Sequence, residues 1–370
     1  MIERKELSDE SKKIVNINCS YIPPELITAS GYNVRRIWPG EIADKGQDLL
    51  PINYCPYSRA FLSQIIDGQK ETIIANSCDA MRRVYDAQNN KSFLLQVPRK
   101  IREIDVNFYK NKLEDMKNVL LNDAKLNKGR NDGEEKNSIS YKQILIKEIK
   151  KFNEIRILMT KLRNKLLDND EVSFSLLIDA LNNHYYNKNK KGIKKIIKKV
   201  EKNKIENNLN KKHEKPGTKP RTIISSSCLL DKSLVKKVEK AGLKVVALDS
   251  CLGERSFDFG VKLGGESPLK SLANAYLEKA PCPRMMEIDR RLEKIKNLIS
   301  ERKASGLIYF IPKFCNQASY DFKYIKDWAQ ENNFPLLKLE GEYNAGLSGK
   351  LTTIIEAFKE SLEFALVSEV

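Results

Sequence analysis

The sequence lacks the features that would place the protein in a membrane or outside the cell. No segment approaches the roughly 18 consecutive apolar residues that a spanning helix needs. The opening segment, MIERKELSDESKK, has no apolar core of the kind found in signal peptides. Hydrophobic residues make up 41% and charged residues 31% of the 370 residues, which is typical of a soluble globular protein. We therefore expect a cytoplasmic protein.

The sequence also has few of the residues and motifs that bind common metals and nucleotides. The chain has two histidines, His184 and His213, and both lie in charged segments where we expect a surface role. It has no GxxxxGKS or GxxxxGKT motif for ATP and no GxGxxG for a dinucleotide, and GLSGK at 346–350 has the wrong spacing. No two of the seven cysteines form the CxxC pair typical of structural zinc. In a reducing compartment each thiol is therefore a core residue, a reactive group or a ligand.

Positive charge is concentrated in one segment. The formal net charge is +17, and residues 188–221 contribute +11 of it. No aromatic residue lies among these lysines to stack on nucleic-acid bases. We therefore predict that these lysines form a solvated helix face; the alternative is a binding surface for an anion or a partner protein. We expect no nucleic-acid partner.

Short apolar runs alternate with helix-length segments near both ends of the chain, which is the pattern of a parallel sheet with crossover helices. The expected strands are 14–18, 32–38, 71–76, 221–226, 243–249, 306–312 and 334–342. The middle of the chain has the pattern of long charged helices. We predict an α/β fold with two doubly wound, flavodoxin-like or Rossmann-like parallel-sheet domains, 1–103 and 213–370, and a helical insert or cap at 104–212.

The cysteines lie at informative places on this map. Five of them directly follow a predicted strand: Cys19, Cys78, Cys228, Cys251 and Cys315. The carboxyl ends of parallel strands form the edge at which open α/β sheets bind ligands. The other two, Cys55 and Cys282, precede a proline at a predicted helix start, where backbone amides favour an anionic group. We therefore predict a shared metal site, and the shortage of histidines and close pairs favours an iron–sulfur cluster over zinc.

Segments that contain these cysteines resemble the 2-hydroxyacyl-CoA dehydratase and benzoyl-CoA reductase superfamily, and within it the double-cubane-cluster reductases. The most specific segments are NYCPYSR at 53–59, NSCDAMRR at 76–83 and FIPKFCNQASYDF at 310–322. The resemblance implies an iron–sulfur reductase that uses low-potential electrons to reduce a small substrate. The alternative is one subunit of a heterodimeric dehydratase, a lyase with one 4Fe-4S cluster. A non-catalytic protein that only carries a cluster is a third interpretation.

The resemblance also implies which residues form the site. Cys55, Cys78 and Cys315 correspond to the thiolates that hold a 4Fe-4S cluster in dehydratase subunits. Cys251, Cys282 and Cys19 would complete a double-cubane 8Fe-9S cluster, with Cys228 as the competitor for the last place. We expect Arg59 and Gln317 to act at the site. Weaker candidates, which could instead cap helices or form surface pairs, are Glu25, Asp79, Arg82, Arg83, Ser319 and Tyr320.

The missing ATP and dinucleotide motifs imply that the electrons come from another protein. By the same resemblance, the donor is a homodimeric ATP-hydrolysing activator that carries its own 4Fe-4S cluster. We expect it to dock on a homodimer of this chain, or on a pair of this chain with a paralogous subunit. The expected substrate is a small molecule, or an acyl-CoA if the chain is part of a dehydratase.

Overall fold

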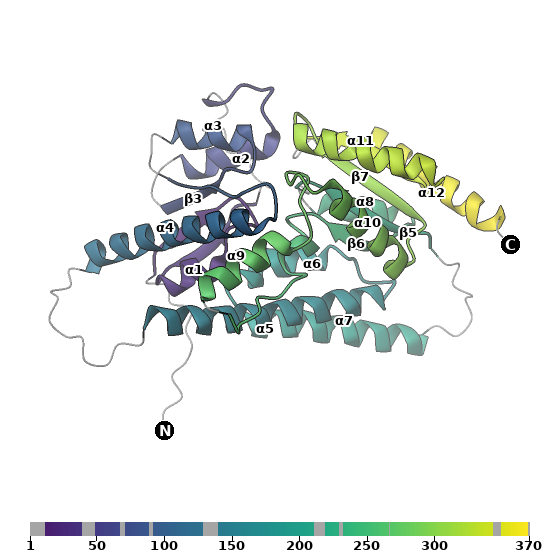
Figure 1. Ribbon diagram of the computed structural model, residues 1–370. Coiled ribbons are helices and arrows are strands. Elements are labelled where there is room, and N and C mark those ends of the chain that lie inside the picture. The colour runs from purple at the N-terminus through teal and green to yellow at the C-terminus, as the bar shows by residue number, and fades with distance from the viewer. Residues whose placement is uncertain are drawn as a thin grey trace.

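The computed structural model describes residues 12–38, 49–66, 71–88, 92–128, 140–210, 219–228, 232–265, 267–342 and 349–368. These residues contain two four-stranded sheets in which all neighbouring strands are parallel. Figure 1 shows the sheets side by side, with two long helices running beneath them. The predicted α/β class with parallel, doubly wound sheets is confirmed.

The first sheet has the strand order β2-β1-β3-β4. Its strands are β1 (Ile14–Ile17), β2 (Asn33–Arg36), β3 (Glu71–Ala75) and β4 (Phe93–Leu95), and its helices are α1 (Pro24–Ala29), α2 (Pro56–Ile65) and α3 (Asp79–Ala87). β1 and β3 are buried along almost their whole length, because a parallel sheet is covered on both faces. The sequence did not predict β4, since three residues are too few for a strand pattern to be recognised.

The second sheet repeats this order as β6-β5-β7-β8. The strands are β5 (Arg221–Ser226), β6 (Lys244–Asp249), β7 (Gly306–Pro312) and β8 (Leu336–Gly341). The helices are α8 (Ser233–Lys240), α9 (Pro268–Glu278), α10 (Ile288–Arg302), α11 (Asn316–Glu331) and α12 (Gly349–Ser368), and η3 (Glu254–Ser256) is a 3-10 turn. Each of the seven strands expected from the sequence coincides with a strand of one of the two sheets.

Every described element between the two sheets is helical. These elements are α4 (Glu103–Lys128), α5 (Tyr141–Leu167), α6 (Leu176–Ala180), the π-helical turn η2 (Leu181–Tyr185) and α7 (Lys190–Asn210). Ser140 and Gln143 form a capping box that begins α5. Along α7, Ile193, Ile197 and Val200 are buried while the lysines between them are exposed, as a solvated charged face requires.

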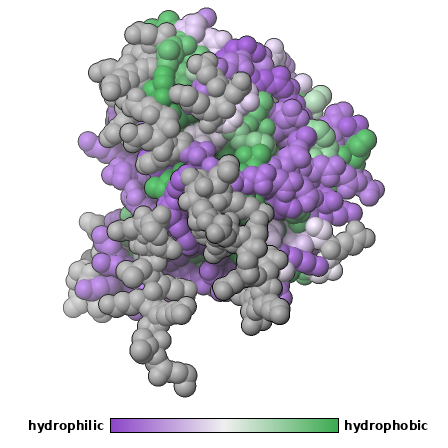
Figure 2. Space-filling model, turned by 90° about the vertical axis from the view of Figure 1, so that its left-hand side faces the viewer, coloured by the Kyte–Doolittle hydropathy of each residue, from purple (hydrophilic) through white to green (hydrophobic). Residues whose placement is uncertain are grey.

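One apolar core connects the two sheets through the helices between them. It includes Ile17 of β1, Phe152 of α5, Leu248 of β6 and Leu272 of α9. A second core covers the opposite face of the second sheet and includes Tyr309. The face shown in Figure 2 is largely hydrophilic. Within the described part of the chain, no helix is both long and apolar enough to cross a bilayer.

Candidate functional site

The carboxyl edges of the two sheets face each other. Arg36, the last residue of β2, donates a hydrogen bond from Nη2 to Sγ of Cys251, which follows β6, over 3.5 Å. Gln317 at the start of α11 donates from Nε2 to the carbonyl oxygen of Ser77, which follows β3, over 2.8 Å. In both sheets the strand order reverses beside the first strand, and ligands of open α/β sheets bind at such a switch point.

Cys55, Cys78 and Cys315, which we call the first thiol set, lie together at this junction. They are the N-cap residues of α2, α3 and α11, and all three are half-buried. Backbone N–H groups of the helix that each cysteine begins lie near its sulfur and act to lower its pKa. Amides at the start of a helix stabilise negative charge, so the three positions suit thiolates.

Hydrogen bonding within the first thiol set separates the pKa values of its members. Cys55 donates its S–H to Cys315, which raises the pKa of Cys55 well above its usual range. Accepting that bond lowers the pKa of Cys315 to about 6, and the Ser227 hydroxyl, 3.3 Å from Cys315 Sγ, contributes to this lowering. Burial raises the pKa of Cys78 to about 11. The arrangement therefore favours the thiolate form of Cys315 over that of Cys55.

The other four cysteines, Cys19, Cys228, Cys251 and Cys282, form a second thiol set. Cys228 donates to Cys251 and lowers the pKa of Cys251 to about 5, with help from the positive charge of Arg36. Burial raises the pKa of Cys282 to about 11, and the charges of Cys251 and Cys19 also act on it. Because Cys19 and Cys228 both lie in this set, the structure does not favour one over the other.

The two sets adjoin through the loop that follows β5. Ser227 contacts Cys315 of the first set, and the next residue, Cys228, belongs to the second. Arg255 fixes this loop by donating to the carbonyl oxygens of Ser226 and Ser227, the latter over 2.9 Å.

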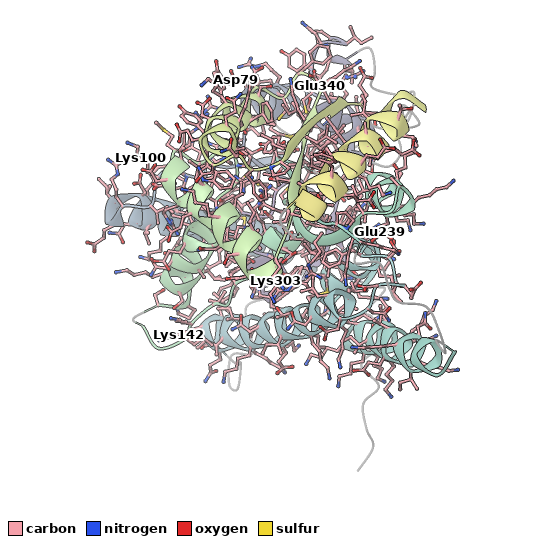
Figure 3. All side chains as sticks on the ribbon, turned by 90° about the vertical axis from the view of Figure 1, so that its right-hand side faces the viewer. Asp79, Lys100, Lys142, Glu239, Lys303 and Glu340 are labelled. Atoms are coloured by element: carbon pink, nitrogen blue, oxygen red, sulfur yellow. The ribbon has the colours of Figure 1, made fainter. Side chains whose placement is uncertain are left out.

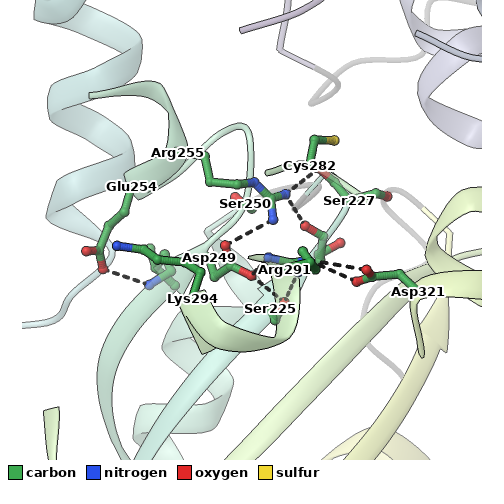
Figure 4. Close-up of polar contacts among 12 residues, drawn as sticks. Ser225, Ser227, Asp249, Ser250, Glu254, Arg255, Cys282, Arg291, Lys294 and Asp321 are labelled. Carbon is green, nitrogen blue, oxygen red and sulfur yellow. Dashed lines mark hydrogen bonds and ion pairs between the residues drawn. The ribbon is translucent and has the colours of Figure 1, made fainter. Parts of the chain in front are cut away.

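A buried ionic network holds Arg255 in place (Figure 4). Nη1 of Arg255 lies 3.0 Å from Oδ1 of Asp249, and Nη1 of Arg291 lies 2.6 Å from the other oxygen of that carboxylate. Arg291 also pairs with Asp321 of α11 over 3.2 Å. The network therefore ties the end of β6 to the loop after β5 and to the helix that begins at Cys315.

Arg59 and Gln317, the two polar residues expected to act at the site, both join the facing edges. Gln317 does so through Ser77, as described above. Arg59 is 8% exposed, donates from Nε to the carbonyl oxygen of Tyr54 over 3.3 Å, and has Nη2 3.9 Å from Oε2 of Glu342, beyond β8. In this structure both residues bond to other protein groups.

The weaker candidates lie in varied places. The Asp79 side chain is 92% exposed at the outer surface (Figure 3), and Arg82 and Arg83 are also largely exposed. Tyr320 is 74% exposed, and Ser319 donates to the carbonyl oxygen of Cys315. Glu25 is fully buried and binds Arg156 and Tyr276, which links α1 to α5 and α9. His184 is half-buried in η2, and His213 and residues 346–348 lie outside the described residues.

Three buried cations beside the second thiol set were not identified from the sequence: Arg36, Arg255 and Lys279. Lys279 donates from Nζ to the carbonyl oxygen of Ser20 over 2.5 Å and lies 4.4 Å from the ring centre of Tyr21. Burial lowers the pKa of Lys279 to about 7. The available signal was the position of these residues in the sequence. Arg36 lies near the end of a predicted strand, and Lys279 is three residues before Cys282.

The donor set fits an iron–sulfur cluster. No three His, Cys, Asp or Glu side chains among the described residues are arranged to hold a single metal ion. The assembled donors are thiols from separate loops, however, and helix amides and buried cations face them. Thiolate ligands with hydrogen bonds to sulfur are the environment in which protein-bound clusters are found.

A cavity of about 390 Å³ opens beside Lys279 and Pro281. Its charged lining residues are Asp258, Glu278, Glu293, Lys279, Arg290 and Lys294. The acidic and basic groups balance, so the lining does not favour a polyanion such as the phosphates of coenzyme A.

Comparison with known proteins decides the family. The model of the family described as 2-hydroxyglutaryl-CoA dehydratase, D-component, matches residues 19–362. The chain belongs to this family. It is 23% identical over 372 residues to the beta subunit of (R)-phenyllactyl-CoA dehydratase from Clostridium sporogenes, covering 97% of this chain and 94% of that one. It is 24% identical over 134 residues to a subunit of benzoyl-CoA reductase from Thauera aromatica, covering 35% of this chain and 34% of that one.

These findings confirm the resemblance seen in the sequence and the expectation of an enzyme. A relative that matches over nearly the whole of both chains is a dehydratase subunit. The comparisons therefore support the dehydratase alternative better than the double-cubane reductase that we placed first.

Proposed function

We propose that the protein is the iron–sulfur subunit of a 2-hydroxyacyl-CoA dehydratase, with a 4Fe-4S cluster held by Cys55, Cys78 and Cys315. The observation that supports this most strongly is that these three thiols begin three helices and lie close enough to act on one another electrostatically. The similarity to a dehydratase subunit over nearly the whole chain agrees with it.

The chain's own residues hold and orient the site. A cluster held by these three cysteines would supply low-potential electron transfer and a Lewis-acidic iron for the substrate. The helix amides of α2, α3 and α11 stabilise the negative thiolates. Gln317 keeps the loop of Cys78 against the helix of Cys315, and Arg59 connects α2 to Glu342. We assign both residues positioning roles, because each acts through another group.

The proposed partners follow from what the chain lacks. The sequence has no nucleotide-binding motif, so we propose an external source of electrons. By the family resemblance, that source is a separate homodimeric ATP-hydrolysing activator with its own 4Fe-4S cluster. The proposed substrate is an acyl-CoA, and the proposed second subunit is a paralogue of this chain. The proposed setting is the cytoplasm, where ATP is available.

Iron analysis tests the cluster assignment. Protein purified without oxygen should contain about four irons per chain. Cys55→Ala, Cys78→Ala and Cys315→Ala should each lose them, whereas the double variant Cys251→Ala/Cys282→Ala should keep them. If all three single variants kept the iron content of the wild-type protein, the ligand assignment would be refuted. With the second subunit and the activator present, turnover should require the acyl-CoA.

The second thiol set favours a second candidate, a homodimeric double-cubane reductase that reduces a small substrate. Four more thiols beside buried cations adjoin the first set. This candidate requires about eight irons per chain, of which about half are lost in Cys251→Ala/Cys282→Ala. The same experiment therefore separates the two candidates.

A further inference from the structure

Arg36 is a buried cation without a carboxylate partner. It is 2% exposed, and none of the described carboxylates lies within ion-pair distance. Its Nη2 donates to Sγ of Cys251 over 3.5 Å, while Nε and Nη1 are buried and bond to none of the described groups. The ionisable groups that act on it most strongly are Tyr57, Cys251, Tyr186 and Cys19. The guanidinium thus faces phenols and thiols.

Lys279 lies in a similar position. It is 4% exposed and donates to the carbonyl oxygen and the hydroxyl of Ser20 over 2.5 and 3.0 Å. It has no ion pair with any carboxylate in the described part of the chain. Cys19 and Cys282 are the groups whose ionisation would most favour its charged form. Arg36 and Lys279 therefore approach the second thiol set from the first and second sheets respectively.

Among the described residues, Arg284 is also buried without a carboxylate partner and donates to the carbonyl oxygens of Val97 and Pro98, whereas four other buried cations are paired with buried acidic groups. The pairs are Arg156 with Glu25, Arg163 with Glu254, Arg255 with Asp249, and Arg291 with Asp249 and Asp321. An unpaired buried charge destabilises a fold strongly. Arg36 and Lys279, two buried basic groups beside four thiols, suit a negative occupant of the same space, which would favour the charged form of Lys279.

We propose that Arg36 and Lys279 are the counter-charges of an anionic iron–sulfur centre bound by the second thiol set, and that they set its reduction potential. The inference rests on the second candidate function. When the centre accepts one electron from an external donor, its charge becomes more negative by one. Nearby positive charge favours that reduced form, so Arg36 and Lys279 raise the potential.

A redox titration followed by electron paramagnetic resonance tests the proposal, with a titanium(III) reductant as the electron source. Arg36→Gln and Lys279→Met should each lower the ratio of reduced to oxidised centre at a fixed potential by about tenfold or more, which is about 59 mV for one electron. Arg36→Lys and Lys279→Arg keep the charge and should restore the ratio. Arg35→Gln is the matched control, because it removes an exposed charge from the adjacent position of β2.

Each outcome has a defined meaning. An unchanged ratio in both charge-removing variants with full iron content would overturn the proposal. If Arg36→Gln loses iron, retention by Arg36→Lys supports a charge effect, and equal loss in Arg36→Lys overturns it. Wild-type protein with about four irons, all retained in Cys251→Ala/Cys282→Ala, overturns this inference and the second candidate but leaves the first-set cluster intact.

Discussion

Replacing Asp249 with asparagine tests whether the buried ionic network stabilises the fold around the thiols. The carboxylate is 1% exposed and contacts two guanidinium groups, those of Arg255 and Arg291. The substitution keeps the shape of the side chain and removes its charge. Arg291 would then keep the carboxylate of Asp321, whereas Arg255 would lose its carboxylate partner and remain a buried, uncompensated positive charge.

The structure sets the expected size of the effect. Removing one partner of a buried ion pair costs about 3 to 5 kcal/mol of unfolding free energy. Burial raises the pKa of Asp249, but Arg255 and Arg291 outweigh it and lower that pKa to about 2. An unfolded aspartate has a pKa of about 3.9, so the lowered value corresponds to roughly 2 to 3 kcal/mol of stability. That contribution is present above about pH 4 and is lost as the pH falls toward about 2.

Urea denaturation at pH 7 and at several values between about pH 4 and pH 2 measures both quantities. Asp249→Asn should lower the unfolding free energy at pH 7 by about 3 kcal/mol or more and should flatten the acid dependence below about pH 4. Asp327→Asn is the control, since it removes the exposed partner of Lys323 and should cost less than about 1 kcal/mol. If Asp249→Asn cost no more than this control, the network would not be a major source of stability and our reasoning would be wrong.

Three further predictions concern other parts of the fold. Gln317→Ala removes the hydrogen bond to Ser77, so it should lower the unfolding free energy by about 1 kcal/mol and reduce the iron content of the purified protein. Unchanged iron content would contradict a positioning role for Gln317. Lys303, directly after α10, is exposed and has a φ of 48°, a left-handed backbone conformation that glycine adopts more easily. Lys303→Gly should therefore raise the melting temperature, and a lower melting temperature would contradict this reasoning. Ile193→Ala should lower the unfolding free energy, measured by urea denaturation, by about 2 to 4 kcal/mol, because Ile193 is buried. Lys194→Ala, on the exposed face of α7, should change it by less than about 0.5 kcal/mol. Equal losses in the two variants would contradict the assigned faces of α7.

The gathering of the cysteines could be predicted from the sequence because it depends on strand direction. Once the runs before Cys19, Cys78, Cys251 and Cys315 are recognised as parallel strands, their carboxyl ends must lie along sheet edges. Apolar runs of five to seven residues identify such strands without knowledge of distant contacts. The three-residue strand β4 gave no such signal and was missed.

The polar surroundings of the thiols could not be predicted in the same way. The chain has 66 lysines and arginines, and nothing in the local sequence separates Arg36, which is buried, from Arg35, which is exposed. Asp79 was considered for the site because it follows Cys78, yet its side chain points to solvent. Such differences depend on which face of one sheet meets the other, and that is a property of the assembled fold.

Each thiol set draws on both sheets, and this makes the placement of the sheets part of the site. In the first set, Cys55 and Cys78 belong to the first sheet and its helices, whereas Cys315 follows a strand of the second. In the second set, Cys19 follows a strand of the first sheet and the other three cysteines belong to the second half of the chain. Any movement that separated the facing edges would therefore spread the ligands of both sets at once. Conversely, a centre bound to either set would hold the two sheets together, since metal binding to ligands from separate elements adds its free energy to that of the fold.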